Sequence, residues 1–354
     1  MTQKKIKEIN VKGTHFDCGY RIGKLTANKI HEILDNDAFI SDFPMKNSFQ
    51  KNLNEFKEIC KKFSFNYYQE LQGISEGAGV NFDKIFLLNS RELKFLYKQK
   101  NMVGGCTTCV VKNDDSFIVG HNEDGHINND IYLLRSKINN EPKLMSVNYY
   151  GYLSGFSVSL NEHGLYALSN YIESKSQMGV PFSFISRSNI IKRDINHAVS
   201  NVIQSHRATG QNYMFFQNGF GVNIETSMND FILKKLNKKF VHTNHYLSKR
   251  MKQFQLKRIN PNETATIFRY KHSLNLFNNI DKVNVVDRKN TSKNLINLSI
   301  KKILKNHDNF PKSICQHGFN DFKTLGSILF DTKKMQLEIS YGNSCKNKYY
   351  KYDF

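Results

Sequence analysis

The stretch Val103-Gly104-Gly105-Cys106-Thr107-Thr108-Cys109-Val110-Val111 marks the point where the character of the chain changes. Before it, apolar residues recur mostly at helical spacing, whereas after it short runs rich in β-branched and aromatic residues follow one another. The glycine pair is typical of a bend, and the residues after it favour a strand. The stretch therefore predicts a bend that leads directly into a strand, with Cys106 at its first position.

The rest of the chain alternates between blocks of helical and blocks of strand pattern. Helical spacing is found in 22–33, 49–63, 67–74, 82–96, 182–191, 194–205, 251–277 and 292–305. Strand patterns are found in 106–111, 117–122, 131–136, 143–149, 156–160, 212–217, 222–225, 231–235, 240–246, 324–330 and 335–341. Short hairpin turns and the lack of a linker predict an α+β fold of antiparallel sheets covered by helices, in a single domain over residues 1–354.

Composition places the chain among folded globular proteins. It has 354 residues, of which 39% are hydrophobic and 23% charged. No segment approaches the ~18 uninterrupted apolar residues of a membrane span, and no apolar run follows the charged N-terminus. We therefore expect a cytoplasmic protein without a membrane partner.

The charge of the chain bears on its possible partners. Lys and Arg number 51 against 31 Asp and Glu, which gives a formal net charge of +20. The basic residues form scattered pairs without a basic arm or a nucleic-acid-binding motif, so nucleic acid is not the expected main partner.

Six widely spaced cysteines in a chain without a signal peptide do not form a disulfide scaffold, and we expect reduced thiols.

Three interpretations of Cys106 remain open. A Cys-x-x-Cys metal or redox site with Cys109 requires convergent thiols, but positions three apart on a strand face opposite sides, and no second Cys-x-x-Cys or fitting His pair is present. A purely structural cysteine after a tight bend is the second interpretation. The third makes Cys106 a nucleophile that the bend exposes.

The residues that face Cys106 favour the third interpretation. If the turn at 113–116 pairs Lys112 with Phe117, Cys106 lies opposite Glu123 and diagonal to Asp124. A register shift of one residue would place Asp124 directly opposite. In either register a carboxylate lies within about 5–8 Å of the cysteine, close enough to shift a proton or hold an amine.

These two segments resemble a known family. Gly105-Cys106-Thr107-Thr108 followed by Gly120-His121-Asn122-Glu123-Asp124 resembles the self-processing motif of the acyl-CoA:6-aminopenicillanate acyltransferase family, also called peptidase family C45, of the N-terminal-nucleophile (Ntn) hydrolases. Further segments that resemble the family are Gly73–Gly79, Asn161–Leu165, Asn170-Tyr171, His242–His245 and Thr324–Ile328. The resemblance implies a four-layer αββα sandwich of two antiparallel sheets between helical layers.

The resemblance also implies a maturation step and an activity. The thiol of Cys106 would break the peptide bond after Gly105 and leave two fragments, 1–105 and 106–354, associated as a heterodimer. The freed α-amine, with a usual pKa of about 7.7–8.0, would then serve as base for the thiol, so that no catalytic histidine, metal or other cofactor is required. The expected substrate is a small linear amide or an acyl thioester such as an acyl-CoA, processed through an S-acyl-enzyme.

Individual roles follow from the same resemblance. Asp124 would orient the α-amine and thiol, Asn244 and the backbone N–H of Tyr171 would stabilise the oxyanion, and Asn170 would shape the pocket. Where the family often has arginine in a late Ser-Ile-x-Arg segment, this chain has Gln316.

Arg187 is a candidate to supply the charge that Gln316 lacks. Cys109 and the four remaining cysteines, Cys18, Cys60, Cys315 and Cys345, are expected to be ordinary thiols. A non-catalytic or redox protein and a basic nucleic-acid-binding protein remain the alternatives, and a higher oligomer remains possible.

Overall fold

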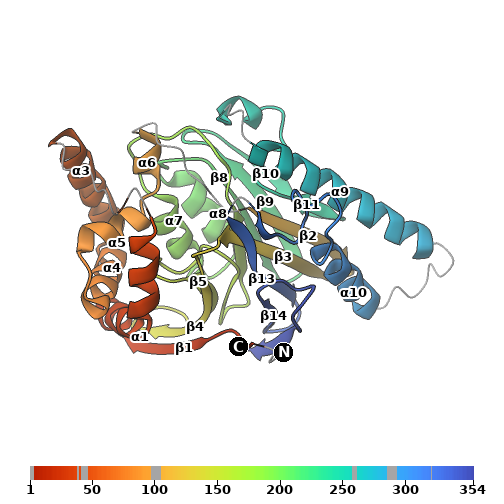
Figure 1. Cartoon of the computed structure of the whole chain (residues 1–354), viewed down its shortest axis with the longest axis horizontal. Helices are drawn as coiled ribbons and strands as arrows, with labels where there is room; N and C mark the ends of the chain where they lie inside the picture. The colour runs from red at the N-terminus through yellow and green to blue at the C-terminus, as the bar shows by residue number, and fades with distance from the viewer. Residues whose placement is uncertain are drawn as a thin grey trace.

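The computed structural model describes residues 4–37, 40, 47–96, 105–256, 261–284, 293–319 and 321–354. Its strands form two sheets (Figure 1). The first has the order β1 (Glu8–Gly13), β4 (Ile131–Ile138), β5 (Leu144–Tyr149), β6 (Ser159–Asn161), β7 (Tyr166–Asn170), β8 (Gln211–Gln217), β9 (Phe220–Thr226), β10 (Phe231–Lys235). The second has the order β11 (Phe240–His242), β2 (Cys106–Asn113), β3 (Ser116–His126), β13 (Phe322–Asp331), β14 (Gln336–Tyr341), β15 (Tyr350–Asp353), with β12 (His317–Phe319) paired to β13.

Helices cover the outer faces of both sheets (Figure 1). On the side of the first sheet lie α1 (His15–Asp35), α3 (Asn47–Phe63), α4 (Phe65–Ala78), α5 (Phe82–Leu88), α6 (Glu92–Leu96), α7 (Phe182–Asn189) and α8 (Ile195–Gln204). On the side of the second sheet lie α9 (Pro261–Asn284) and α10 (Lys293–Leu304), preceded by a short 3-10 helix, η1 (Met251–Phe254). Within the described ranges, no helix combines the length and the apolar character that crossing a bilayer requires.

Side chains that alternate along β2 show how the layers are packed. Val110 belongs to the large core that lies between the sheets and continues under the N-terminal helices. Its neighbours Cys109 and Val111 belong instead to a second core with Ile300 and Leu304 of α10. The second sheet is thus buried on both faces, and the architecture is the expected αββα sandwich.

The β2–β3 hairpin has the predicted register. Lys112 pairs with Phe117 and Cys106 pairs with Glu123, while Asp114 in the turn has a φ of 49°. Cys106 is the first residue of β2 and lies at the edge of the space between the sheets. As predicted, Cys106 and Cys109 point to opposite faces of β2, since Cys109 belongs to the core under α10 whereas Cys106 lines the pocket between the sheets.

Two local expectations are wrong. The first sheet is not purely antiparallel, because β1 pairs with β4 in parallel and the helical N-terminal block separates them in sequence. The strand expected over 240–246 ends at His242, since the next residues bond to a helix: Thr243 Oγ1 donates to the carbonyl of Thr266, and the Asn244 N–H donates to Thr266 Oγ1. Asn244 therefore lies beyond the strand.

The glycines of α4 serve helix packing. Gly73 and Gly77 lie inside the helix and face α1. A Cβ atom at Gly77 would overlap the carbonyl oxygen of Tyr20, and one at Gly73 would overlap that of Phe16. The two backbones are thus in direct contact, which fixes α1 against α4.

Candidate active site

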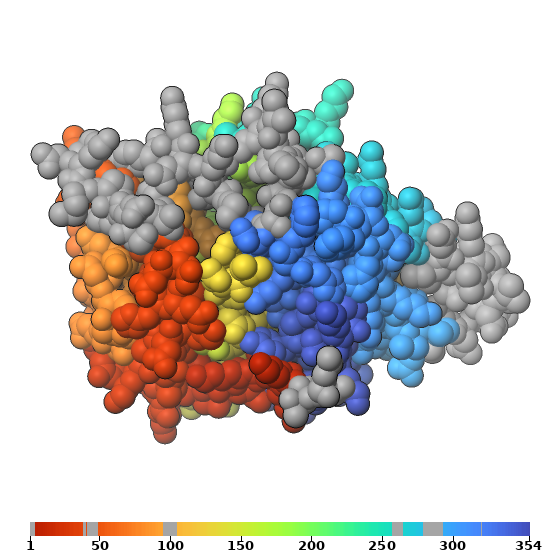
Figure 2. Space-filling model, viewed as in Figure 1, coloured from red at the N-terminus to blue at the C-terminus, as the bar shows by residue number. Residues whose placement is uncertain are grey.

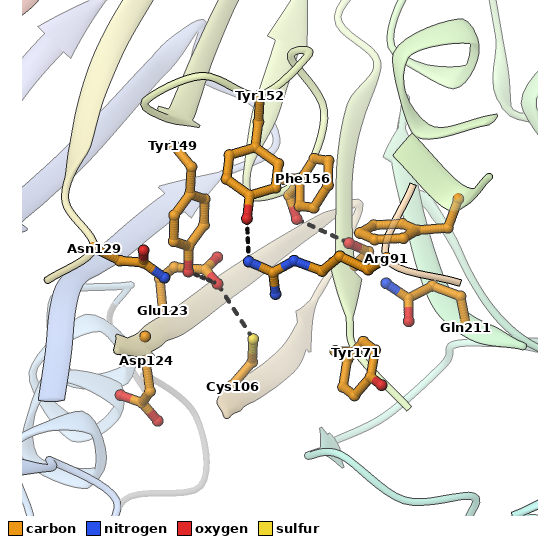
Figure 3. A pocket seen from close by; sticks show the side chains of 13 residues that line it. Arg91, Cys106, Glu123, Asp124, Asn129, Tyr149, Tyr152, Phe156, Tyr171 and Gln211 are labelled. Carbon is orange, nitrogen blue, oxygen red and sulfur yellow. Dashed lines mark hydrogen bonds between the residues drawn. The ribbon is translucent and has the colours of Figure 1, made fainter. Parts of the chain in front are cut away.

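The thiol of Cys106 lies in a pocket between the two sheets (Figure 3). Cys106 is 5% exposed, and its Sγ lies 3.5 Å from Oε1 of Glu123 on the neighbouring strand. Burial, together with the nearby carboxylates of Glu123 and Asp124, raises the pKa of the thiol well above its usual value. The sulfur is therefore protonated, and a carboxylate oxygen of Glu123 lies in position to accept its proton.

Glu123 belongs to a buried polar network. The Tyr149 hydroxyl donates to Oε1 at 2.7 Å, and His121 Nε2 lies 3.1 Å from Oε2. On its other side, His121 Nδ1 lies 2.8 Å from the hydroxyl of Thr108. These contacts hold the Glu123 carboxylate beside the sulfur.

The backbone of Cys106 is held by two side chains from distant parts of the chain. Its N–H donates to Oδ1 of Asn244 at 2.9 Å, and its carbonyl accepts from Nη1 of Arg269 at 2.6 Å. Arg269 Nη2 also donates to Asn244 Oδ1 at 2.8 Å. Because both groups that face this atom of Asn244 are donors, it must be the amide oxygen.

Gly105 is constrained by a close approach. A Cβ atom there would lie 2.5 Å from Nη2 of Arg269 and 3.1 Å from Oδ1 of Asn244. The Gly105 carbonyl accepts a hydrogen bond from the backbone N–H of Asp124 at 2.8 Å. A side chain at position 105 would therefore displace Arg269 or Asn244 from Cys106.

Asp124 is buried beneath this junction. Its Oδ1 accepts from the Thr324 hydroxyl at 2.6 Å, and its Oδ2 lies 4.0 Å from Nη1 of Arg269. Burial raises the pKa of Asp124 to about 6, even though Arg269 and the Thr324 hydrogen bond act in the opposite direction. Thr324 is fixed in turn by Gln316, whose backbone N–H donates to the threonine hydroxyl at 2.9 Å.

The structure brings most of the predicted residues together. Asn244 Nδ2 donates to the carbonyl of Tyr171 at 3.0 Å, and Tyr171 lines the pocket directly after β7. Asn170 lies deeper, where its Oδ1 accepts from Thr108 at 2.9 Å. Gln316 contributes through its backbone, as described above.

Arg187 lies elsewhere. It is fully buried in α7, where its guanidinium pairs with Glu70 at 3.0 Å and with Glu141 at 2.6 Å. It does not line the pocket of Cys106. The expectation that it replaces the family arginine therefore finds no geometric support.

Sequence reasoning missed two arginines at the site. Arg269 of α9 supplies the positive charge beside Cys106 and Asp124, and Arg91 lines the pocket near Tyr152, to whose hydroxyl it donates. Neither residue belongs to a recognisable motif. No feature of the sequence therefore distinguishes them from the rest of the 51 lysines and arginines.

The remaining walls of the pocket are mostly aromatic. They are formed by Tyr149, Tyr152, Phe156, Tyr171 and Phe182, with Ser169 and Gln211 as polar neighbours. Cys106, His121 and Glu123 together offer three potential metal ligands within 4.8 Å of one another. Their mutual hydrogen bonds already account for this proximity without an ion.

Comparison with known proteins gives related sequences with different reactions. A β-alanyl-dopamine/carcinine hydrolase of Drosophila melanogaster is 27% identical over 214 residues, and the match covers 54% of this chain and 55% of that protein, so the chain spans about half the length of this relative. The 40 kDa form of an acyl-coenzyme A:6-aminopenicillanic-acid acyltransferase of Emericella nidulans is 21% identical over 91% of this chain and 88% of its own.

Solved structures give weaker matches. A conjugated bile acid hydrolase mutant from Clostridium perfringens has a TM-score of 0.46 at 10% identity, covering 70% of this chain and 97% of its own. A penicillin V acylase from Agrobacterium tumefaciens has a TM-score of 0.43 at 12% identity, covering 70% and 86%.

The family profile gives the broadest evidence. The profile described as acyl-coenzyme A:6-aminopenicillanic acid acyl-transferase matches residues 110–346, which is more than half of the chain. The matched range includes Glu123, Asp124, Asn244 and Arg269 of the site, and it begins four residues after Cys106. The chain belongs to the acyl-coenzyme A:6-aminopenicillanic acid acyltransferase family.

Proposed function

We propose that the protein is a self-processing Ntn cysteine amidohydrolase or acyltransferase with Cys106 as its nucleophile. The observation that carries the proposal is the environment of Cys106: its thiol lies in the pocket beside Glu123, while its backbone nitrogen is bonded to Asn244. A nitrogen held in this way is already positioned to become a catalytic α-amine once the peptide bond before it is broken.

Self-cleavage begins with the thiol. Sγ attacks the carbonyl carbon of Gly105 while its proton passes to Glu123, and the N–H of Asp124 polarises the same carbonyl. The Gly105–Cys106 C–N bond then breaks, the nitrogen takes up a proton, and a thioester joins Gly105 to Sγ. Water hydrolyses the thioester, which leaves a carboxylate on Gly105 and a free thiol and amine on Cys106.

The mature enzyme would use the same groups on a substrate. The α-amine, held by Asn244 Oδ1 and close to Asp124, takes the proton of the thiol as the sulfur attacks an amide or thioester carbonyl. Asn244 Nδ2 carries two hydrogens, of which the carbonyl of Tyr171 accepts one. The second would be donated to the oxyanion. The S-acyl-enzyme is then released by water in hydrolysis or by an amine in acyl transfer.

The walls of the pocket suggest the kind of substrate. Aromatic rings on several sides favour an acyl or aryl group, and Arg91 offers a positive charge for an anionic or carbonyl group. Both relatives named above act on small molecules according to their names, and one of them is named for acyl-CoA. We therefore propose a small linear amide or an acyl thioester as the substrate.

The intact mass of freshly purified protein tests the self-cleavage. Division of the 41.2 kDa chain at Gly105–Cys106 gives fragments of roughly 12 and about 29 kDa. Cys106→Ala should remain one chain, whereas Cys109→Ala, which alters the opposite face of β2, should still be cleaved. A Cys106→Ala protein that still breaks at this bond would refute the proposal.

A further inference from the structure

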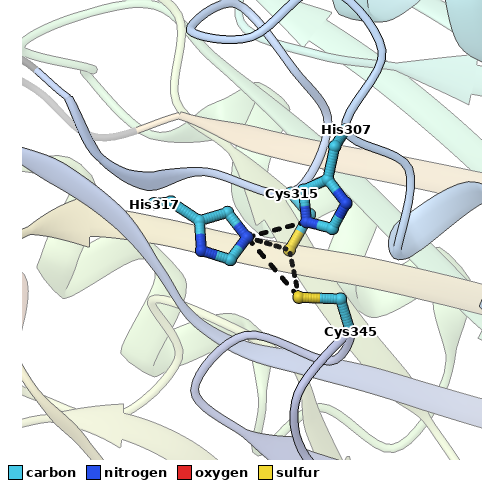
Figure 4. A group of neighbouring side chains, drawn as sticks. All are labelled: His307, Cys315, His317 and Cys345. Atoms are coloured by element: carbon cyan, nitrogen blue, oxygen red, sulfur yellow. Dashed lines mark hydrogen bonds between the residues drawn. The ribbon is translucent and has the colours of Figure 1, made fainter.

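Four potential metal ligands meet at the end of the second sheet, apart from the pocket of Cys106 (Figure 4). His307 lies in the loop after α10, Cys315 lies two residues before β12, His317 is the first residue of β12, and Cys345 lies in the connection between β14 and β15. The ligand atoms of all four lie within 4.8 Å of one another. Two thiols and two imidazoles are a ligand set of structural zinc sites.

The distances between the ligand atoms match tetrahedral coordination. Bonds of about 2.3 Å to sulfur and about 2.0–2.1 Å to nitrogen require S···S separations of about 3.8 Å and S···N separations of about 3.5–3.6 Å. The two Sγ atoms lie 3.9 Å apart, and His317 Nε2 lies 3.6 Å from Cys315 Sγ and 3.5 Å from Cys345 Sγ. Three separations thus agree with the ideal values.

The fourth measured separation needs a small adjustment. Nε2 of His307 and Nε2 of His317 lie 2.7 Å apart, as in a hydrogen-bonded pair of imidazoles. Around a shared ion they would lie about 3.3 Å apart. His307 is exposed on a loop, so its ring can move by this amount without disturbing the core.

We propose that His307, Cys315, His317 and Cys345 form a Zn²⁺ site. As the two Zn–S bonds form, each thiol releases its proton to solvent, and the two thiolates neutralise the charge of the ion. Asn343 Nδ2 already lies 3.4 Å from Cys315 Sγ, where its N–H supports a thiolate. With four protein ligands no position is left open for substrate, so the ion has a structural role.

The site ties together three segments that are separate in the sequence. It also lies next to the active site, because Gln316 stands between two of the ligands and its backbone holds Thr324, which bonds to Asp124. Zinc would thereby fix the position of the Asp124 carboxylate.

Metal analysis of the full-length protein is the first test. Protein purified from zinc-containing medium without chelator should carry about one zinc ion per chain by elemental mass spectrometry. Cys345→Ser and His317→Ala should each lose the ion. Cys18→Ala and Cys106→Ala should keep it, which separates this site from free thiols and from the group at Cys106.

Milder probes cover the case in which a ligand variant fails to fold. Asn343→Ala leaves all four ligands in place and should weaken zinc binding by about 10–100-fold in a chelator competition. Cobalt added to the metal-free protein should give the visible bands of a tetrahedral site with sulfur ligands. A Cys315–Cys345 disulfide in protein purified under non-reducing conditions, or metal-free protein that binds neither ion, would overturn the proposal.

Discussion

At the scale of single residues, the two ends of the Asn244 side-chain amide make different contacts. The oxygen accepts hydrogen bonds from the Cys106 N–H and from Arg269, whereas the nitrogen donates to the carbonyl of Tyr171. In the proposed reaction the first end would position Cys106, and the second would stabilise the oxyanion. Substitution can separate these roles because aspartate preserves the acceptor and removes the donor.

We expect Asn244→Ala and Asn244→Asp both to lower kcat by about 10²–10³ in protein that has already been cleaved, because both lack the amide donor. KM should change little. Steady-state kinetics on an activated amide or thioester, with fragment masses confirmed beforehand, make the measurement. If Asn244→Asp keeps near-parental turnover while Asn244→Ala does not, the residue only positions Cys106, and the oxyanion assignment is wrong.

At the scale of helices and strands, the buried Arg187 connects several elements and lies outside the pocket of Cys106. It joins α7 to Glu70 of α4 and to Glu141 after β4, and His15 of α1 contacts both carboxylates. Burial alone would raise the pKa of Glu141, but Arg187 and His15 outweigh this effect and hold it at about 2. The network therefore links three helices and a sheet.

We expect Arg187→Met to lower the free energy of unfolding by about 3–5 kcal/mol at neutral pH, because two buried carboxylates lose their main partner. The pKa of Glu141 is lower in the folded protein than its usual value near 4.5, so the ionised carboxylate stabilises the fold above pH 4.5. This stabilisation should be lost as the pH falls toward 2. The free energy of unfolding of Arg187→Met should fall less over the same pH range, because the variant lacks the main partner of Glu141. Denaturant unfolding between these pH values measures both effects.

A matched control for Arg187 is the exposed Arg193 in the turn before α8. Arg193→Met should change the free energy of unfolding by no more than about 0.5 kcal/mol. If Arg187→Met unfolds like the parent but raises KM strongly, Arg187 belongs to the substrate site after all.

Contacts between neighbouring strands could be predicted from the sequence, whereas contacts between segments far apart in the sequence could not. The pairing of Cys106 with Glu123 could be predicted because a short turn fixes the register of the hairpin. Arg269 could not, because it reaches Cys106 from a helix 163 residues away, and no local pattern specifies such a contact. The strand expected through Asn244 failed for a similar reason, since bonds to Thr266 of α9 replace further pairing.

The cluster of His307, Cys315, His317 and Cys345 shows the same limit. Its ligands come from three segments, so the spacing resembles no compact zinc motif, and the cysteines were expected to be ordinary thiols. The overall architecture could be predicted, because the alternating blocks of helix and strand patterns indicate sheets covered by helices. The parallel pairing of β1 with β4 was missed because the pairing partner lies beyond the whole N-terminal helical block.

At the scale of the whole molecule, the described residues before Cys106 form one side of the protein and not a detachable extension. Figure 2 shows them in red and orange against the later parts of the chain in yellow and blue. They contribute β1 to the first sheet, most of the helical layer over that sheet, and Glu70 to the network of Arg187. Cleavage at Gly105–Cys106 would therefore leave two fragments that share a sheet and a core.

We expect the mature protein to elute from size-exclusion chromatography as one species with the mass of the uncleaved chain, and to separate into fragments only in denaturant. Val11 is buried in β1, where it pairs with Ser136 of β4, and its neighbour Lys12 is exposed. Val11→Glu should lower the free energy of unfolding by about 3 kcal/mol, because it places an unpaired charge in the interface, and should release the fragments at lower denaturant concentration. Lys12→Glu changes the charge on the outer face of the same strand and should leave the association intact. Separate elution of the two fragments of the parental protein in native buffer would show that β1 and its helices do not form one folded unit with the fragment that carries Cys106.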